Sequence, residues 1–157
     1  MKILFLCTGN SCRSIIAEML ANHLGEGRIS ALSAGSQPTG RVHPRALAVL
    51  ERHGIPVAEP SSDSWERFAE QKIDLVITVC DSAAGESCPL WMGDVPKVHW
   101  GVADPAKAEG TEDEIEAAFE ATYEAMRQRI EQLVGLELAL LTPKQVASAC
   151  QDIHASV

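Results

Sequence analysis

The chain has 157 residues, of which 46% are hydrophobic and 22% are charged, and these values are typical of one globular domain with a full hydrophobic core. Its formal net charge of −9 argues against a nucleic-acid or membrane-surface partner, because both would require a basic face. No apolar run approaches the roughly 18 residues of a membrane span, and the run after Lys2 is too short for a secretory signal. We therefore expect a cytoplasmic protein.

Short apolar runs alternate with amphipathic runs along the chain. The expected strands cover residues 2–6, 29–34, 73–79 and 97–100, and the expected helices cover residues 13–24, 44–53, 62–69, 112–134 and 143–154. Gly25 is placed to cap the first helix, and Ser61 or Ser62 can cap the third. This alternation predicts an α/β fold, a three-layer sandwich with a four-stranded parallel sheet flanked by helices. Residues 1–134 would form the main domain, and residues 135–157 a C-terminal helical extension packed on it.

The segment from Cys7 to Ser14 joins the first strand to the first helix, and its residues are mostly small or turn-forming. Such a loop can curl so that its backbone N–H groups point inward and bind a tetrahedral oxyanion at the helix N-terminus. Arg13 would add a planar guanidinium that grips two oxygens at once. Cys7 would lie beneath the anion, where the positive field favours its thiolate, the nucleophilic form. The predicted anion-binding residues are Thr8, Gly9, Asn10, Ser11, Cys12 and Ser14.

Three chemistry-bearing residues follow the ends of different strands. Cys7 ends the first, Cys80 ends the third, and Asp104 closely follows the fourth. Because ligands of open parallel sheets bind beyond the carboxyl ends of the strands, we expect these residues to meet at one edge. Asp104 is the candidate general acid that protonates the departing oxygen, and the alternative is an aspartate that only caps a turn or helix.

The five cysteines are better explained by redox chemistry than by a zinc site, because no two of them have the C-x-x-C spacing. Cys80 could attack an adduct on Cys7 to give a Cys7–Cys80 disulfide, and Cys88 could then carry it outward as Cys80–Cys88. Alternatively, Cys80 is a buried strand-end residue and Cys88 a loop thiol without function. Cys12 is a rival resolving thiol in poor geometry, and Cys150 is most simply a packing residue.

Four motifs together resemble one known family. They are CTGNSCRS at residues 7–14, TVCD at residues 78–81, CP at residues 88–89, and HWG followed by DP within residues 99–105. Over about residues 1–134 they are similar to arsenate reductases with the low-molecular-weight tyrosine phosphatase fold. The resemblance implies that arsenate is reduced to arsenite, with Cys7 as nucleophile, residues 8–13 as oxyanion cradle, Asp104 as acid, and Cys80 and Cys88 as the disulfide relay. Phosphate and sulfate would then be competing oxyanions.

The same resemblance leaves several points open. The reductant would be thioredoxin, or glutaredoxin with glutathione, and the Cys80-to-Cys88 spacing is slightly longer than in the best-known reductases. No cofactor is required, although some relatives bind potassium at positions that match Asn10, Glu18, Ser33 and Asp63 here. One alternative is a low-molecular-weight protein tyrosine phosphatase using Cys7, Arg13 and Asp104. Against it, Ile15 and Ala106-Lys107 stand where such phosphatases carry a proline and aromatic residues. The non-enzymatic alternative is a thiol redox or arsenic-sensing module.

Overall fold

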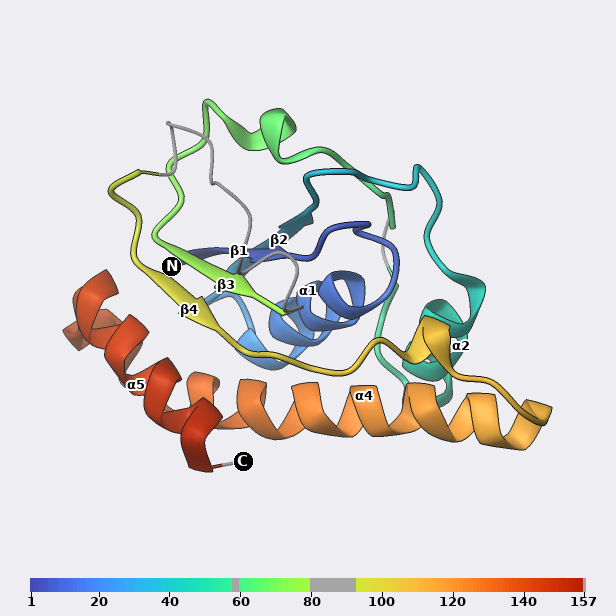
Figure 1. Ribbon diagram of the computed structural model, residues 1–157. Helices are drawn as coiled ribbons and strands as arrows, with labels where there is room; N and C mark the ends of the chain where they lie inside the picture. Colours follow the sequence, from blue (N-terminus) through green and yellow to red (C-terminus); the bar gives the residue numbers. More distant parts are fainter. Residues whose placement is uncertain (58–59, 80–92, 157) are drawn as a thin grey trace.

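In the computed structural model, residues 1–57, 60–79 and 93–156 are described. Four strands form one parallel sheet in the order β2-β1-β3-β4 (Figure 1). They are β1 (Lys2–Leu6), β2 (Ser30–Ala34), β3 (Leu75–Thr78) and β4 (Lys97–His99). The register aligns the last residues of the strands in one row, because Leu6 pairs with both Ala34 and Thr78, and Thr78 pairs with His99. The strand order reverses between β1 and β3, so the switch point of the sheet lies at the end of β1.

The α-helices are α1 (Arg13–Gly25), α2 (Pro44–Arg52), α4 (Glu112–Val134) and α5 (Pro143–Ser156). The short 3-10 helices are η1 (Trp65–Phe68), η3 (Pro105–Lys107) and η4 (Leu138–Leu140). In Figure 1 the helices α1, α2, α4 and α5 lie on one side of the sheet and η1 lies on the other. The predicted α/β class and four-stranded parallel sheet are confirmed.

Alternate residues of the central strands supply two separate cores. Ile3 and Phe5 of β1 belong to the large cluster of buried residues that includes residues of α1 and α4. Leu4 and Leu6 face the other way and pack with Phe68 of η1. Successive side chains of a strand point to opposite faces, so a strand covered on both sides must be apolar throughout. This explains the continuous apolar run at residues 3–6.

The ends of the predicted elements differ from the structure in three places. The strand β1 has the expected bounds, and the other three strands are shorter than expected by one to three residues. Gly25 belongs to α1, and the left-handed residue that follows is Glu26, with φ of 46°. Gly25 is nevertheless required, because a Cβ there would lie 2.9 Å from the Cβ of Ile29. The cap of η1 is Ser64, whose hydroxyl accepts the N–H of Glu66, rather than Ser61 or Ser62.

The C-terminal helix α5 packs against β4 and α4. Val146 and Cys150 are fully buried, and the indole Nε1 of the buried Trp100 donates a hydrogen bond to the carbonyl of Cys150 at 2.9 Å. The end of the chain therefore contributes to the main core, beside the strand that leads toward Asp104. In the described ranges, no helix combines the length and the apolar character needed to cross a membrane.

Candidate active site

A small pocket of about 170 Å³ lies at the carboxyl edge of the sheet, at the end of β1. Its lining residues come from the β1–α1 loop, from the segment after β2 and from the segment after β4: Cys7, Gly9, Ser11, Cys12, Arg13, Thr39, Asp104 and Ala106. Pockets that enclose drug-sized ligands measure about 300–1,000 Å³, so this one suits a small anion. The structure thus brings Cys7 and Asp104 together, as the strand-end argument predicts for these two residues, with Arg13 of the anion loop beside them.

The loop of residues 8–12 is held in shape through its carbonyl groups. Three of them accept hydrogen bonds from backbone N–H groups of residues 37–43: Thr8 from Gln37 at 3.0 Å, Gly9 from Thr39 at 3.0 Å, and Ser11 from His43 at 2.9 Å. Carbonyls that are tied to an outer segment cannot point into the loop. This leaves the interior of the loop to N–H groups, which is the arrangement that binds an anion.

Asn10 shapes the same loop from behind. It is fully buried and adopts a left-handed conformation with φ of 46°, which asparagine tolerates better than most residues. Its amide nitrogen donates to the hydroxyl of Ser14 at 2.9 Å, and its amide oxygen accepts the backbone N–H of Asp63 at 2.6 Å. Neither Asn10 nor Ser14 is among the residues that line the pocket. The side chain of Asn10 therefore stabilises the shape of the loop through hydrogen bonds and does not line the pocket.

Arg13 is the first residue of α1 and faces the segment after β4. Its Nη1 donates to the carbonyl of Val102 at 3.0 Å, and its Nη2 lies 3.5 Å from Oδ2 of Asp104. Its Nε is buried and has no hydrogen-bond partner among the residues described. The N-cap residue, Cys12, makes no side-chain capping bond, and the first turn of α1 carries no acidic residue. The positive end of the helix therefore adds to the charge of the guanidinium.

Asp104 both caps a short helix and reaches the pocket. It has an extended backbone and caps η3, because its Oδ1 accepts the N–H of Ala106 at 3.0 Å. Its other carboxylate oxygen faces Arg13 at the pocket, and its side chain is 24% exposed. A group in this position is reachable by water and can exchange protons with a bound anion.

The cysteines of the described residues differ in their chemistry. Cys7 and Cys12 both line the pocket and are 5% and 3% exposed. Burial, with a smaller contribution from the nearby Asp104 carboxylate, raises the pKa of the Cys12 thiol to about 12. Burial likewise raises the pKa of Cys150 to about 12, in the core under α5. Cys12 and Cys150 are therefore protonated and poor nucleophiles at neutral pH.

The remaining predicted site residues are placed as follows. Gly9 and Ser11 line the pocket, whereas Thr8 does not and contributes its carbonyl to the contact with Gln37. Cys80 and Cys88 lie outside the described residues. Thr39 lines the pocket without having been predicted, and its methyl group lies 3.3 Å from where a Cβ on Gly9 would be. No local sequence signal marks Thr39, because its position depends on the path of the whole segment after β2.

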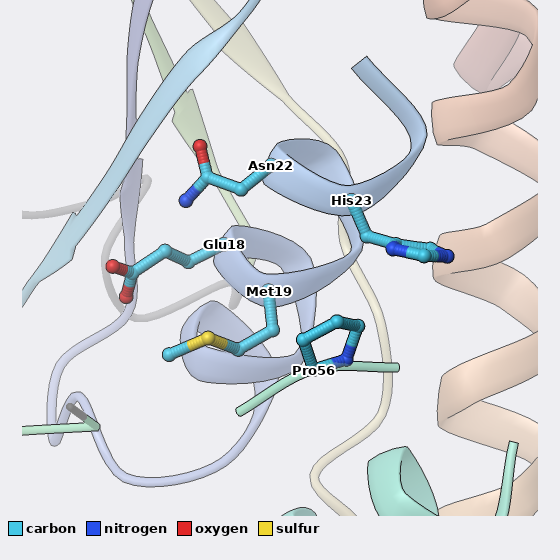
Figure 2. Close-up of a pocket in the computed structure, with 5 residues that line it drawn as sticks. All are labelled: Glu18, Met19, Asn22, His23 and Pro56. Carbon is cyan, nitrogen blue, oxygen red and sulfur yellow. The ribbon is translucent and has the colours of Figure 1, made fainter. Parts of the chain in front are cut away.

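Behind the loop, Glu18 of α1 forms a second polar site. Figure 2 shows Glu18 and Asn22 extending from one side of α1, away from His23. Glu18 lines a pocket of about 320 Å³, and its carboxylate accepts the hydroxyl hydrogen of Ser33 at 2.5 Å. Burial, with a smaller contribution from the carboxylate of Asp63, raises the pKa of Glu18 to about 7. Across residues 1–57, 60–79 and 93–156, no cationic side chain lies within ion-pair distance of Glu18.

A cysteine at the end of a parallel strand, beneath an anion-sized pocket with an arginine and a carboxyl group, defines a class of enzyme that attacks tetrahedral oxyanions or their esters with a thiolate. The comparison with known sequences agrees: the model of the family "Low molecular weight phosphotyrosine protein phosphatase" matches residues 2–148. The chain belongs to this family. The match continues past residue 134, the predicted boundary of the main domain, into α5.

Within the family, several of the similar proteins are named arsenate reductases. The one from Bacillus licheniformis is 43% identical over 129 residues, and the one from Halalkalibacterium halodurans is 41% identical over 128 residues; each alignment covers 82% of this chain and 91% of the relative. A solved structure described as an arsenate reductase in the phosphate binding state superposes with a TM-score of 0.67 at 31% identity, covering 85% of this chain and 96% of that one. A thioredoxin-dependent arsenate reductase from Corynebacterium glutamicum superposes with a TM-score of 0.60 at 26% identity, covering 80% of this chain and 58% of that one.

Proposed function

We propose that this protein reduces arsenate to arsenite. The observation that carries the proposal is the pocket in which Cys7, Arg13 and Asp104 meet at the switch point of the sheet. The family match and the names of the similar proteins support it. A relative solved in a phosphate-binding state supports a tetrahedral oxyanion as the ligand.

In the first step the Cys7 thiolate attacks the arsenic atom of arsenate, and a sulfur–arsenic bond replaces one arsenic–oxygen bond. The departing oxygen takes a proton from Asp104 and leaves as water. Arg13 and the inward N–H groups of the loop bind the other oxygens, where negative charge accumulates in the transition state. Cys7 is only 5% exposed, so bulk water is excluded around it and these interactions are stronger.

In the second step the Cys80 thiolate attacks the sulfur of Cys7. A disulfide forms, the sulfur–arsenic bond breaks, and its electron pair reduces arsenic from the pentavalent to the trivalent state, which leaves as arsenite. The Cys88 thiolate then attacks Cys80, so that Cys7 is released as a thiolate and Cys80–Cys88 becomes the disulfide. A dithiol reductant of the thioredoxin type would reduce that disulfide, and the thioredoxin-dependent relative supports this choice over glutathione.

The test is arsenate-dependent NADPH oxidation with thioredoxin and thioredoxin reductase. Wild-type protein should sustain many turnovers, and Cys7→Ser should abolish them. Cys80→Ser should stop the reaction at the covalent adduct on Cys7, which intact mass spectrometry would detect. Full multiple turnover by Cys80→Ser would disprove the relay. Turnover by Cys88→Ser alone would identify a small thiol as the reductant, and binding without turnover in the wild type would favour a sensing module.

The phosphatase alternative predicts efficient hydrolysis of aryl phosphates. The pocket argues against it, because none of the residues that line it is aromatic and Thr39 and Ala106 offer an aromatic ring little contact area. We expect weak activity on p-nitrophenyl phosphate and none that requires Cys80. If kcat/KM for a phosphotyrosine peptide exceeded that for arsenate, the phosphatase would be the correct assignment.

We also propose that a potassium ion is held behind the loop. Glu18, Ser33, Asn10 and Asp63 present oxygen atoms, the donors preferred by hard cations, and Glu18 lacks a cationic partner among the described residues. A bound ion would compensate the buried charge of Glu18. Potassium chloride should then raise the Tm of the wild type more than choline chloride at equal ionic strength, and the difference should vanish in Glu18→Gln. Equal effects of both salts on the wild type would refute the site.

A further inference from the structure

Arg129 of α4 is a buried cation that has no acidic partner among the described residues. The residue is 7% exposed, and burial lowers its pKa. Its Nη1 donates to the carbonyl of Gly101 at 3.5 Å, and its Nε is buried without a hydrogen-bond partner in the part of the chain that the structure describes. Two residues earlier on the same helix, the more exposed Arg127 forms ion pairs with Glu124 and Glu131 at 2.7 and 2.8 Å.

Burial of an arginine without a counter-charge is unfavourable for the fold. The desolvation penalty of a buried ion is several kcal/mol, and one long hydrogen bond to a carbonyl offsets little of it. An apolar side chain of similar length at position 129 would extend the apolar stripe of α4 that includes Met126 and Leu133. Stability alone therefore does not account for an arginine at this position. The contact of Arg129 with the carbonyl of Gly101 indicates a different role.

The segment of residues 100–102 links β4 to Asp104, and hydrogen bonds hold several of its backbone N–H and carbonyl groups. The N–H groups of Trp100 and Val102 donate to Thr78 and Val79 at 2.7 and 3.2 Å, which ties the segment to the end of β3. The carbonyl of Val102 accepts from Nη1 of Arg13 at 3.0 Å. The carbonyl before it, that of Gly101, accepts from Arg129. Two arginines from different helices thus hold consecutive carbonyls of the segment that carries Asp104.

We propose that Arg129 is a positioning residue for the arsenate-binding pocket, acting through the Gly101 carbonyl to set the orientation of the segment that presents Asp104 to the departing oxygen. The inference rests on the proposed function, in which Asp104 supplies the proton. Without the Arg129 contact, the Gly101–Val102 peptide group keeps only the hydrogen bond from its N–H to the carbonyl of Val79, so its carbonyl side is free to tilt. The orientation of Asp104 then depends on its own η3 cap and on Arg13. A displacement of about 1 Å from the productive geometry is enough to slow a proton transfer about a hundredfold.

The test measures single-turnover arsenate reduction by Arg129→Met, with Arg127→Met as the matched control on the same helix. We expect Arg129→Met to lower the rate at saturating arsenate at least tenfold, with less than a twofold change in the arsenate concentration that gives half the maximal rate. Its Tm should equal or exceed that of the wild type, because an uncompensated buried charge has been removed. Arg129→Lys should recover part of the rate, since an ammonium group can still donate to Gly101. Arg127→Met should keep the wild-type rate.

The double variant Arg129→Met/Asp104→Asn separates the inference from the function on which it rests. If Arg129 acts through Asp104, the double variant should be no slower than Asp104→Asn alone. If Asp104→Asn itself reacts at the wild-type rate, the proposed acid is wrong. If Asp104→Asn is slow but Arg129→Met is not, or if the two losses multiply, the positioning function of Arg129 is wrong. A parallel fall of Tm and rate in Arg129→Met would make the residue purely structural and would also overturn the inference.

Discussion

Arg13 is held at two atoms before any ligand arrives, and this makes its geometry as important as its charge. The guanidinium donates to Val102 with one nitrogen and faces Asp104 with another, while the buried Nε has no partner among the described residues. Lysine would keep the charge but offer a single nitrogen at the end of a flexible chain. We expect Arg13→Lys to raise the arsenate KM about 10–100-fold, which corresponds to the loss of a charged hydrogen bond of about 1.5–3 kcal/mol. Initial rates over a range of arsenate concentrations measure this. An unchanged KM would mean that the N–H groups of the loop bind the anion alone.

Glu18 should give the protein a stability that falls as the pH rises. Burial raises its pKa from 4.5 to about 7, so the folded protein holds the proton over a pH range in which the unfolded chain has lost it. Below about pH 4.5 both states are protonated and the contribution is fully present; it is lost progressively up to about pH 7. In potassium-free buffer, Glu18→Gln should gain about 3 kcal/mol in free energy of unfolding relative to the wild type between pH 4.5 and pH 8.

Urea unfolding at several pH values measures this difference, and Glu70→Gln, an exposed glutamate, is the control. The control should remain parallel to the wild type at every pH. If the Glu18→Gln and wild-type curves are also parallel, Glu18 is already charged at pH 5 and the cause assigned to burial is incorrect. Potassium should flatten the wild-type curve, because the ion would favour the charged form of the carboxylate.

Some of the residues that line the pocket could be predicted from the sequence and others could not, and the difference has a physical cause. Cys7 and Asp104 follow strands, and parallel strands in register must end at the same edge, so their convergence follows from pattern alone. Thr39 reaches the pocket from a loop whose path depends on contacts with residues 8–11, which periodicity does not encode. Arg129 lies three residues after Met126, a spacing that places it on the buried stripe of α4. This position could have been recognised from the sequence, but a search for apolar residues alone passes over an arginine.

At the scale of elements, the segment of residues 35–43 gives the anion loop its shape. It begins at Gly35, whose N–H donates to Asp63 and whose carbonyl accepts from Trp65, so that it lies between the loop and residues 63–65. A Cβ at Gly35 would lie 2.3 and 2.5 Å from the carbonyl oxygens of Thr8 and Cys7. Backbone atoms of a buried strand end cannot move aside without altering the loop itself.

Gly35→Ala should therefore lower both stability and arsenate affinity. We expect a loss of about 1–3 kcal/mol in free energy of unfolding, as in other overpacked sites, and a rise in arsenate KM of at least tenfold. Urea unfolding and initial rates give the two values. Gly135→Ala is the matched control, because a Cβ there would be 3.4 Å from its nearest neighbour, which is ordinary contact. Wild-type KM in Gly35→Ala would show that the loop tolerates displacement of the Cys7 and Thr8 carbonyls.

The helices α2 and α4 explain how a chain of net charge −9 binds an anion. Three acidic residues of α4 pair with arginines of α2: Arg45 pairs with Glu112, and Arg52 pairs with Glu116 and Glu120 at 2.7 and 3.0 Å. His53 stacks on Tyr123 and also contacts Glu120. Exposed pairs of this kind contribute little to stability, but they reduce the local negative field. The positive groups of the anion loop then determine the potential at the pocket.

At the scale of the whole molecule, the order of the strands in the sheet could not be predicted from the sequence pattern. Alternating strands and helices predict a parallel sheet, but several strand orders satisfy that pattern, and only packing selects β2-β1-β3-β4. That order places β1, and therefore Cys7, at the centre of the sheet. It also leaves β4 as the last strand of the sheet in the part of the chain that the structure describes, next to α5.

The helix α5 lies against that outer strand and should therefore be required for stability rather than for chemistry. Val146 is fully buried and Ile153 is 7% exposed, and each such side chain contributes about 1.5–3 kcal/mol; the bond from Trp100 to Cys150 adds about 1 kcal/mol. The sum is comparable with the whole stability of an average domain, about 5–15 kcal/mol, so a chain ending at Thr142 should be largely unfolded at 37 °C. Val146→Ala should lose about 2 kcal/mol in urea unfolding yet keep the wild-type arsenate KM, while Lys144→Ala, an exposed change on the same helix, should alter neither. If Val146→Ala raised the arsenate KM while leaving stability unchanged, α5 would act on the pocket through β4 and Trp100 instead.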